Sequence, residues 1–379
     1  MPVFHRTRLA EDLARKLVEP PATSASPSGL FLAAPRRTGK STFLREDLRP
    51  ALEALGALVI YADLWADRGA DPGEVIVTAV RDALQRREGV VSRLARLSGL
   101  EKVSVGGVDF SLDRVGLAKG VSLSTALAAL SDEIRHLIVL IVDEAQHAIT
   151  SHAGSDALFA LKAARDELNS SVHHGLRIVA TGSNRDKLAM LRNNKDQAFF
   201  GAPLIGFPTL GQDYVDWFVS QLPYRDELDP KHVFNWFAAA AYRPEMLGAA
   251  SDALYFDLQA QPGDYAARFE ALVREQVKAS NDETLRVVHS LTPLQAAVLR
   301  VLAGAGVAYA PFEAATMARY AEVLAGVDPR SKVRPDVNNV NQALMALQEK
   351  GLVWKAARGV YALEDAFLAE LMQQAGMLG

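Results

Sequence analysis

The chain has 379 residues, with 41 lysines and arginines against 45 aspartates and glutamates, and a formal net charge of −4 at pH 7. At roughly 100 to 200 residues per domain, this length predicts two or three domains. A hydrophobic fraction of 49% with 23% charged residues excludes a disordered or fibrous chain, and the acidic balance excludes an overall polycation. The absence of cysteine excludes disulfides, thiolate-zinc sites and a cysteine nucleophile, and favours a cytoplasmic location.

Strand-like and helix-like stretches alternate through the first half of the chain. Apolar runs predict strands at residues 30–33, 57–63, 137–142, 176–181 and 203–207, and helical spacing predicts helices at 41–55, 74–87, 124–136 (capped by Ser124) and 156–168. A breaker-rich loop from Pro20 to Gly29 precedes the first strand, and Pro50 is expected to kink or split the first of these helices. The alternation predicts an α/β core with a parallel sheet covered by helices on both faces.

One insertion is expected in this core. Residues 102–112 place apolar side chains alternately around Gly106-Gly107, which predicts a β-hairpin. Such a hairpin either covers a sheet edge or contacts a polymer or a neighbouring subunit. The longest aliphatic run, at 137–142, is far shorter than the roughly 20 residues of a membrane helix, so no membrane interaction is expected.

The second half of the chain is predicted to be mainly helical. Aromatic-rich helices begin at Gln212, and their tryptophans and phenylalanines are expected to be core residues. From about Leu291, helical stretches at 293–302, 312–324 and 337–350 precede a short hairpin at 352–363, the element order of a winged helix. We therefore expect three domains, at residues 1–210, 211–288 and 289–379.

A candidate phosphate-binding loop lies between the first strand and the following helix. Its pattern, Ala-Pro-Arg-Arg-Thr-Gly-Lys-Ser-Thr, matches GxxxxGK[ST] except at the first glycine, which is Ala34 here, a mild departure if that residue keeps a negative φ. Backbone N–H groups of such a loop bind phosphates, the lysine meets the β and γ phosphates, and the serine ligates Mg²⁺. The residues expected to hold ATP are Pro35, Arg36, Arg37, Thr38, Gly39, Lys40, Ser41 and Thr42. An ordinary turn with solvated basic residues is the alternative.

A second motif completes the expected site. The aliphatic strand at 137–142 ends in Asp143 and Glu144, and acids at that position lie at the carboxyl edge of a parallel sheet, where ligands bind. Asp143 would hold Mg²⁺ through water, and Glu144 would orient the attacking water. A solvated strand end remains the alternative for either acid alone.

These motifs carry a family resemblance. The loop PRRTGKST, the acidic strand end followed by Ala-Gln146, and Ala-Thr-Gly-Ser-Asn184 at the end of the next strand resemble AAA+ ATPases of the origin-recognition-like and archaeal-ATPase groups. The resemblance covers most of the chain and implies a P-loop core, a helical lid, and a C-terminal winged helix.

The resemblance also implies roles for residues outside the two motifs. Asn184 occupies a polar sensor position near the γ phosphate, with a turn-forming asparagine as the alternative. Phe4 lies in a segment that packs on adenine, unless it is tucked into the core. Arg243 resembles the lid arginine that reaches the phosphates, unless it is solvated.

An arginine finger for a neighbouring subunit is less clearly indicated. Arg192 is the nearest candidate and Arg185 is the alternative, but the segment from Phe199 to Ala202 lacks the arginine that many relatives carry there. The sequence therefore leaves open whether the chain forms a homo-oligomer.

The C-terminal domain carries residues suited to DNA. The third helix of a winged helix enters the major groove, where asparagine and glutamine pair with adenine. The candidates are Arg334, Asn338, Asn339, Asn341 and Gln342, with Lys332, Lys355 and Arg358 for phosphates. From residue 291 onward, however, eight basic residues balance eight acidic ones. The open alternative is that these polar residues cap a helix and that the domain binds a protein.

The sequence is therefore interpreted as an ATP- and Mg²⁺-dependent AAA+-type ATPase, acting as a switch or motor on DNA or on a DNA-bound assembly. The alternative is an ATP-dependent scaffold that recruits a protein partner with little or no hydrolysis. A nucleotide kinase is disfavoured, because such enzymes need an acceptor pocket and do not carry a winged helix.

Overall fold

The computed structural model describes residues 2–67, 69–87, 116–118, 121–170, 173–192, 197–357, 359–365 and 367–378. Contacts divide the chain into two units. Residues 5–34 and 41–207 form the sheet unit, and residues 1–4, 35–40 and 208–379 form the helical unit. The hairpin predicted around Gly106-Gly107 lies outside the described residues.

The sheet unit is built on five parallel strands in the order β2–β5–β6–β1–β7. They are β1 (Leu30–Ala33), β2 (Leu58–Asp63), β5 (Ile138–Asp143), β6 (Leu176–Gly182) and β7 (Leu204–Gly206), each within one residue of a predicted strand at either end. A small antiparallel pair, β3 (Gly116–Ala118) and β4 (Val121–Ser122), precedes α6. The parallel sheet that the alternation predicts is confirmed.

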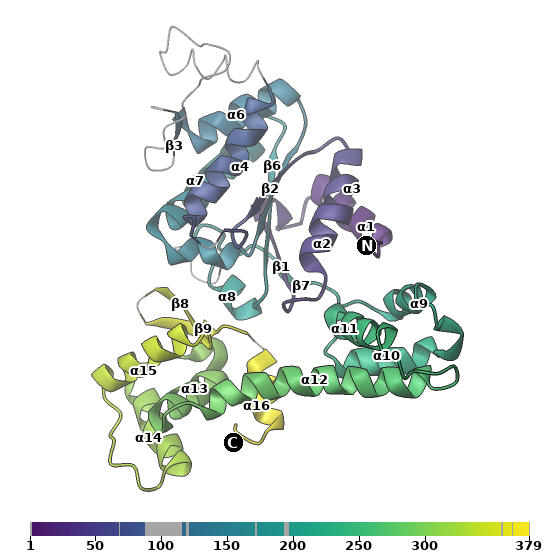
Figure 1. The fold of residues 1–379 in the computed structure, drawn as a ribbon. Coiled ribbons are helices and arrows are strands. Elements are labelled where there is room, and N and C mark those ends of the chain that lie inside the picture. Colours follow the sequence, from purple (N-terminus) through teal and green to yellow (C-terminus); the bar gives the residue numbers. More distant parts are fainter. Residues whose placement is uncertain are drawn as a thin grey trace. The chain divides into compact units, whose positions relative to one another are not determined.

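Helices cover both faces of this sheet (Figure 1). The helices of the sheet unit are α1 (Thr7–Val18), α2 (Lys40–Phe43), α3 (Arg49–Ala54), α4 (Pro72–Gln85), α6 (Leu123–Ile134), α7 (His152–Ser170) and α8 (Arg185–Ala189), with short helical turns at Ser26–Ser28 and Ala145–Thr150. On β5, Ile138, Leu140 and Val142 pack toward α4, α6 and α7. Val139 and Ile141 pack toward α1 and α3. The period of two along a strand sends its apolar side chains into two cores.

Two local features depart from or refine the predictions. A π-helical turn, Leu44–Leu48, separates α2 from α3, and Pro50 lies in the first turn of α3, where its missing N–H removes no helical hydrogen bond. The segment predicted to be kinked or split by Pro50 is therefore helical throughout, with its irregular turn before Pro50. The predicted N-cap of α6 was wrong by two residues. Ser122, not Ser124, accepts the Thr125 backbone N–H, at 3.0 Å.

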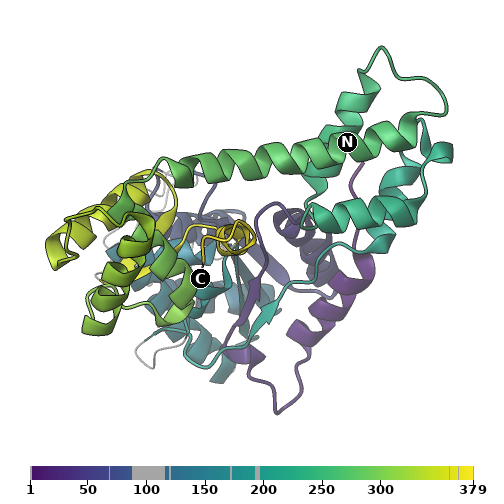
Figure 2. The same ribbon diagram turned by 90° about the horizontal axis from the view of Figure 1, so that it is seen from below.

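The helical unit contains two apolar cores that share one long helix. Its helices are α9 (Gln212–Ser220), α10 (Pro230–Ala239), α11 (Pro244–Tyr255), α12 (Tyr265–His289), α13 (Pro293–Ala305), α14 (Ala314–Val327), α15 (Val337–Glu349) and α16 (Phe367–Gln374), with short turns at Arg225–Glu227 and Gly306–Ala308. Figure 2 shows α12 as a single uninterrupted helix. Phe269 and Val273 of α12 pack with α9, α10 and α11, whereas Val288 packs with the C-terminal elements.

The C-terminal elements follow the order expected for a winged helix. Helices α13, α14 and α15 precede an antiparallel hairpin of β8 (Val353–Ala357) and β9 (Val360–Leu363). Capping boxes begin α13 at Thr292 and α15 at Asp336. The additional helix α16 was not predicted. No helix in the described part of the chain is long and apolar enough to span a membrane.

Candidate nucleotide site

Asp143 stands at the centre of a buried polar cluster in the sheet unit. It is the last residue of β5 and is 1% exposed. Its Oδ2 accepts hydrogen bonds from Ser41 Oγ at 2.7 Å and from the Tyr61 hydroxyl at 2.9 Å. Its Oδ1 accepts from Thr181 Oγ1 and from the Glu144 backbone N–H. Three neighbouring strands and the start of α2 therefore meet at one carboxylate, because the carboxyl ends of parallel strands share one edge.

The hydroxyl donors from Ser41, Tyr61 and Thr181 are neutral groups. Burial, and then the neighbouring Asp143 carboxylate, raise the pKa of Tyr61 well above its ordinary value, so that its hydroxyl stays protonated and donates. Arg45 lies over the Tyr61 ring at 4.9 Å and binds Asp63, not Asp143, at 2.6 Å. A carboxylate and a serine hydroxyl at this position are hard oxygen donors of the kind that Mg²⁺ prefers.

Glu144 is held in an unusual conformation next to this cluster. Its backbone is left-handed, with φ 54° and ψ 42°, a strained region for a residue with a side chain. Its Oε2 accepts from Gln146 Nε2 at 2.6 Å and from Ser183 Oγ at 2.9 Å. The Ser183 backbone N–H also donates to Oε2, at 3.4 Å, so groups from the turn after β5 and from the end of β6 orient the carboxylate.

Residues 35–40 of the phosphate-loop pattern form a tight turn and belong to the helical unit, whereas residues 34, 41 and 42 belong to the sheet unit. Gly39 has φ +82° and Arg37 has φ +63°, and Thr38 Oγ1 donates to the Pro35 carbonyl at 2.8 Å. Thr38 and Lys40 are buried, at 2% and 5% exposure. Only glycine adopts the Gly39 conformation without steric strain. Ala34, in the position of the first consensus glycine, keeps a negative φ, so its methyl group is compatible with the loop.

Both arginines of the loop are paired with acids from distant parts of the helical unit. Arg36 Nη2 donates to Glu364 Oε1 at 2.6 Å, and Arg37 Nη1 lies 3.9 Å from Glu245 Oε1. Arg36 is therefore partly shielded from solvent, whereas Arg37, whose side chain is 69% exposed, stays largely solvated, as the ordinary-turn alternative expects. Pro35 and Thr42 are exposed.

Solved structures match this chain over nearly its whole length, whereas no protein-family model and no curated protein matches its sequence. A Walker-type ATPase of Pyrococcus abyssi is 18% identical, with 98% of this chain and 96% of that chain covered and a TM-score of 0.51. The ORC2 protein of Aeropyrum pernix, solved in its ADP form, is also 18% identical, with 100% and 97% covered and a TM-score of 0.52. The chain has the fold of the origin-recognition-like AAA+ ATPases.

Within this AAA+ fold, the polar sensor candidate acts as a helix cap. Asn184 Oδ1 accepts the backbone N–H groups of Asp186 and Lys187, at 2.8 and 3.2 Å, and begins α8. This is the capping role that asparagine performs at many helix starts. Asn184 therefore has a local structural role, as the alternative interpretation expected, and its contact with a phosphate stays a prediction.

The residues expected from the N-terminus and lid of the AAA+ fold lie in the helical unit. The Phe4 ring lies 5.5 Å from the rings of both Tyr214 and Trp217, in the aromatic core of α9. Arg243 donates to the Ala240 carbonyl at 3.1 Å and to Ser280 Oγ at 3.2 Å, so it is not a solvated arginine. Burial lowers the pKa of Arg243 from its ordinary value.

The arginine-finger candidates remain predictions. Arg185 Nη2 donates to the Leu204 carbonyl at 3.4 Å. Arg192 lies at the end of a described segment, directly before residues 193–196, which the structure does not describe. Neither position establishes a role toward a second subunit.

On the predicted recognition helix α15, one candidate is engaged within the chain itself. Asn339 Oδ1 accepts the Asp336 backbone N–H at 2.9 Å, and its Nδ2 donates to the Arg334 carbonyl at 2.8 Å. The capping alternative therefore holds for Asn339. Asn338 and Gln342 are exposed on the same helix. Arg358 lies outside the part of the chain that is described.

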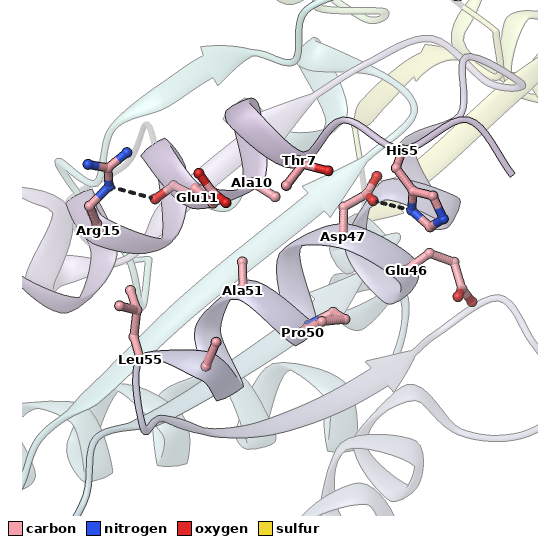
Figure 3. A pocket seen from close by; sticks show the side chains of 11 residues that line it. His5, Thr7, Ala10, Glu11, Arg15, Glu46, Asp47, Pro50, Ala51 and Leu55 are labelled. Carbon is pink, nitrogen blue, oxygen red and sulfur yellow. Dashed lines mark hydrogen bonds and ion pairs between the residues drawn. The ribbon is translucent and has the colours of Figure 1, made fainter. Parts of the chain in front are cut away.

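A separate groove lies between α1 and α3 (Figure 3). It has a volume of about 640 Å³ and is lined by His5, Thr7, Ala10, Glu11, Arg15, Glu46, Asp47, Pro50, Ala51, Ala54 and Leu55. Its polar centre is the pair of His5 Nδ1 and Asp47 Oδ1, 2.7 Å apart. None of the predicted phosphate-binding residues lines this groove, so we do not assign it to the nucleotide.

Sequence reasoning missed the partners of the two acids. Tyr61 is two residues before Asp63 on β2, and Thr181 and Ser183 lie in the segment that ends β6. The available signal was the clustering of hydroxyl side chains at strand ends. Only the strand order places these hydroxyls beside β5.

Proposed function

We propose that this chain binds ATP with Mg²⁺ and hydrolyses it, as a switch or motor acting on DNA or on a DNA-bound assembly. The observation that carries the proposal is the 2.7 Å hydrogen bond between Ser41 Oγ and Asp143 Oδ2. It brings the end of the phosphate-loop pattern to the acid at the end of β5, the two groups that would share a magnesium ion. The ADP form of the A. pernix ORC2 protein supports nucleotide binding by this fold.

The residues present fit magnesium. Mg²⁺ uses one or two protein oxygen ligands and completes its shell with water and substrate phosphates. When bound, the ion neutralises phosphate charge.

The chain's own groups would divide the remaining work. The loop N–H groups, Lys40 and Arg36 would hold the phosphates, and Glu144 would orient the attacking water with Ser183 and Gln146 holding its carboxylate. Arg243, Asn184 and Arg192 are proposed, on the resemblance, to contact phosphate in this or a neighbouring subunit. The expected domain boundaries at residues 210 and 288 belong to the same proposal.

The partner is proposed to bind through the C-terminal helices and hairpin. Asn338 and Gln342 are exposed on α15, and their amides could pair with adenine, with Lys332 and Arg334 near phosphates. The balance of eight basic and eight acidic residues from residue 291 onward favours the second candidate function, an ATP-dependent scaffold that binds a protein partner.

ATP hydrolysis by the purified protein, with and without duplex and single-stranded DNA, tests the proposal. Turnover should vanish in Lys40→Ala and in Glu144→Gln, while Glu144→Gln keeps Mg²⁺-dependent ATP binding. Glu53→Gln, which removes an exposed ion pair with Arg49, is the matched control and should behave as wild type. Tight ATP binding without turnover would move the conclusion to the scaffold, and a wild-type protein that binds no ATP would overturn both.

A further inference from the structure

The segment after the C-terminal hairpin is bound to the phosphate loop. Glu364 follows β9 directly, and its Oε1 accepts from Arg36 Nη2 at 2.6 Å, across 328 residues of sequence. The backbone N–H of Glu364 donates to the Leu352 carbonyl at 2.9 Å, which ties it to the start of the hairpin. The two side chains are 35% and 19% exposed for Arg36 and Glu364, so the ion pair is partly shielded from water.

The same segment contacts the lid arginine. Phe367, the first residue of α16, has its ring centroid 5.6 Å from the Arg243 guanidinium. The nearby Asp365 carboxylate acts on Arg243 electrostatically. Two arginines predicted to meet phosphates, from two different elements, therefore interact with Glu364, Asp365 and Phe367.

The chemistry of these contacts is that of a competitor for phosphate. A guanidinium binds carboxylate and phosphate oxygens through the same N–H donors, so one arginine side chain exchanges one for the other. A nucleoside triphosphate brings several negative charges to the loop, whereas Glu364 brings one. Phosphate at Arg36 would therefore displace the Glu364 carboxylate.

We propose that Arg36 and Glu364 form a latch between the C-terminal hairpin and the phosphate loop, and that ATP binding opens this latch. This inference rests on the proposed function, because it requires ATP to bind at residues 35–42. The latch couples the nucleotide site to the elements proposed to bind DNA or protein. By thermodynamic reciprocity, ATP weakens the latch by the same factor by which the latch weakens ATP binding.

The sign of one affinity change tests the latch. Glu364→Gln should tighten Mg²⁺·ATP binding by about fivefold, as measured by calorimetry on the full chain. A partly exposed ion pair contributes a coupling free energy of about that size. Glu322→Gln is the matched control, since Glu322 forms a 2.6 Å pair with Arg319 on α14, and it should leave ATP affinity unchanged. If the ion pair only positions the loop for ATP, Glu364→Gln should instead weaken ATP binding.

A double variant checks that the effect runs through Arg36. Arg36→Ala alone should weaken ATP binding, and adding Glu364→Gln to it should give no further tightening. Hydrogen exchange of residues 352–367 supplies a readout that is independent of affinity: protection should fall when Mg²⁺·ATP is added to wild type and should already be low in Glu364→Gln.

The outcomes separate the latch from the ATP site. Wild type that binds ATP, together with unchanged or weaker binding by Glu364→Gln, overturns the latch and leaves the proposed function intact. ATP binding by Glu364→Gln but not by wild type supports both. Absence of binding in both proteins overturns the proposed function and the latch with it.

Discussion

Two charged clusters, one in the sheet unit and one in the helical unit, are built in opposite ways. The Asp143 carboxylate is 1% exposed and accepts hydrogen bonds from hydroxyl groups of β2, β6 and α2. In the phosphate loop, Arg36 and Arg37 are instead paired with acids from sequence-distant helices and from the end of the hairpin. One cluster is set by strand register, and the other by ion pairs between flexible side chains.

This difference separates a rigid part from an exchangeable one. Buried hydrogen bonds to a carboxylate are expensive to break, because the carboxylate or its donors are then left unsatisfied. Partly exposed ion pairs contribute little and are easily replaced by another anion. The Asp143 cluster is therefore suited to hold a metal ion, and the arginine pairs are suited to respond to a nucleotide.

Removing the central carboxylate should break the rigid cluster. Asp143→Ala leaves the Ser41, Tyr61 and Thr181 hydroxyls without their acceptor, so we expect the free energy of unfolding to fall by about 3 kcal/mol. Asp63→Ala, at the paired position of the neighbouring strand, removes a partly exposed ion pair with Arg45 and a hydrogen bond from the Trp65 backbone N–H, and should cost about 1 kcal/mol. Chemical denaturation measures both, and equal losses would contradict the distinction.

Removing a hydrogen bond that orients the Glu144 carboxylate should lower turnover without changing nucleotide affinity. Ser183→Ala removes the hydroxyl that donates to the Glu144 carboxylate at 2.9 Å and keeps the longer contact from the Ser183 backbone N–H. Misplacing a group that positions the attacking water should lower kcat roughly tenfold. Steady-state kinetics and calorimetry measure the two quantities, with the exposed Ser220→Ala as control. A rise in kcat would instead show that Ser183 restrains Glu144.

Tyr61→Phe should weaken the same cluster by a single hydrogen bond. We expect a loss of about 1 kcal/mol in the free energy of unfolding near neutral pH. Because burial raises the pKa of Tyr61 in the folded state, its protonated form stabilises the fold below its ordinary pKa of about 10, and this contribution falls as pH rises further. Denaturation between neutral and strongly alkaline pH should therefore show a shallower alkaline decline in Tyr61→Phe than in wild type.

The second loop arginine should give the smallest effect. Arg37 is 69% exposed and lies 3.9 Å from Glu245, so Arg37→Gln should change the free energy of unfolding by less than about 0.5 kcal/mol. Thermal denaturation at two salt concentrations measures it. A loss comparable to that of Asp143→Ala would place Arg37 in the rigid cluster.

Much of the fold was predictable from local pattern. The aliphatic run at 137–142 became β5, whose residues are buried on both faces, and the loop pattern placed Lys40 at the start of α2. The polar strand ends and the serine after Lys40 also indicated which groups would meet. These features depend on the periods of two and of about 3.6 residues and on motif spacing, both of which are readable along the chain.

The partners of those groups were not predictable. Asn339 and Asn184 carry the same amide as Asn338, and only the helix starts at α15 and α8 assign them to capping. Ser122 replaces Ser124 as a cap because the helix begins two residues earlier than its apolar spacing indicates. Such choices depend on competing hydrogen bonds of similar strength, which a pattern of residue types does not rank.

The sequence by itself determined the alternating elements, the phosphate-loop pattern and the acids at the end of β5, because these follow from side-chain period and backbone preference. Tertiary structure decided that Tyr61, Thr181 and Ser41 share the Asp143 carboxylate. In sequence they lie 82, 38 and 102 positions from Asp143, and the packing of the elements, with strand order β2–β5–β6, brings them to one edge. Tertiary structure also decided that Glu364 meets Arg36, a contact across 328 residues. Hydrogen bonds and ion pairs form between groups that are close in space, and closeness in space is set by how the elements pack.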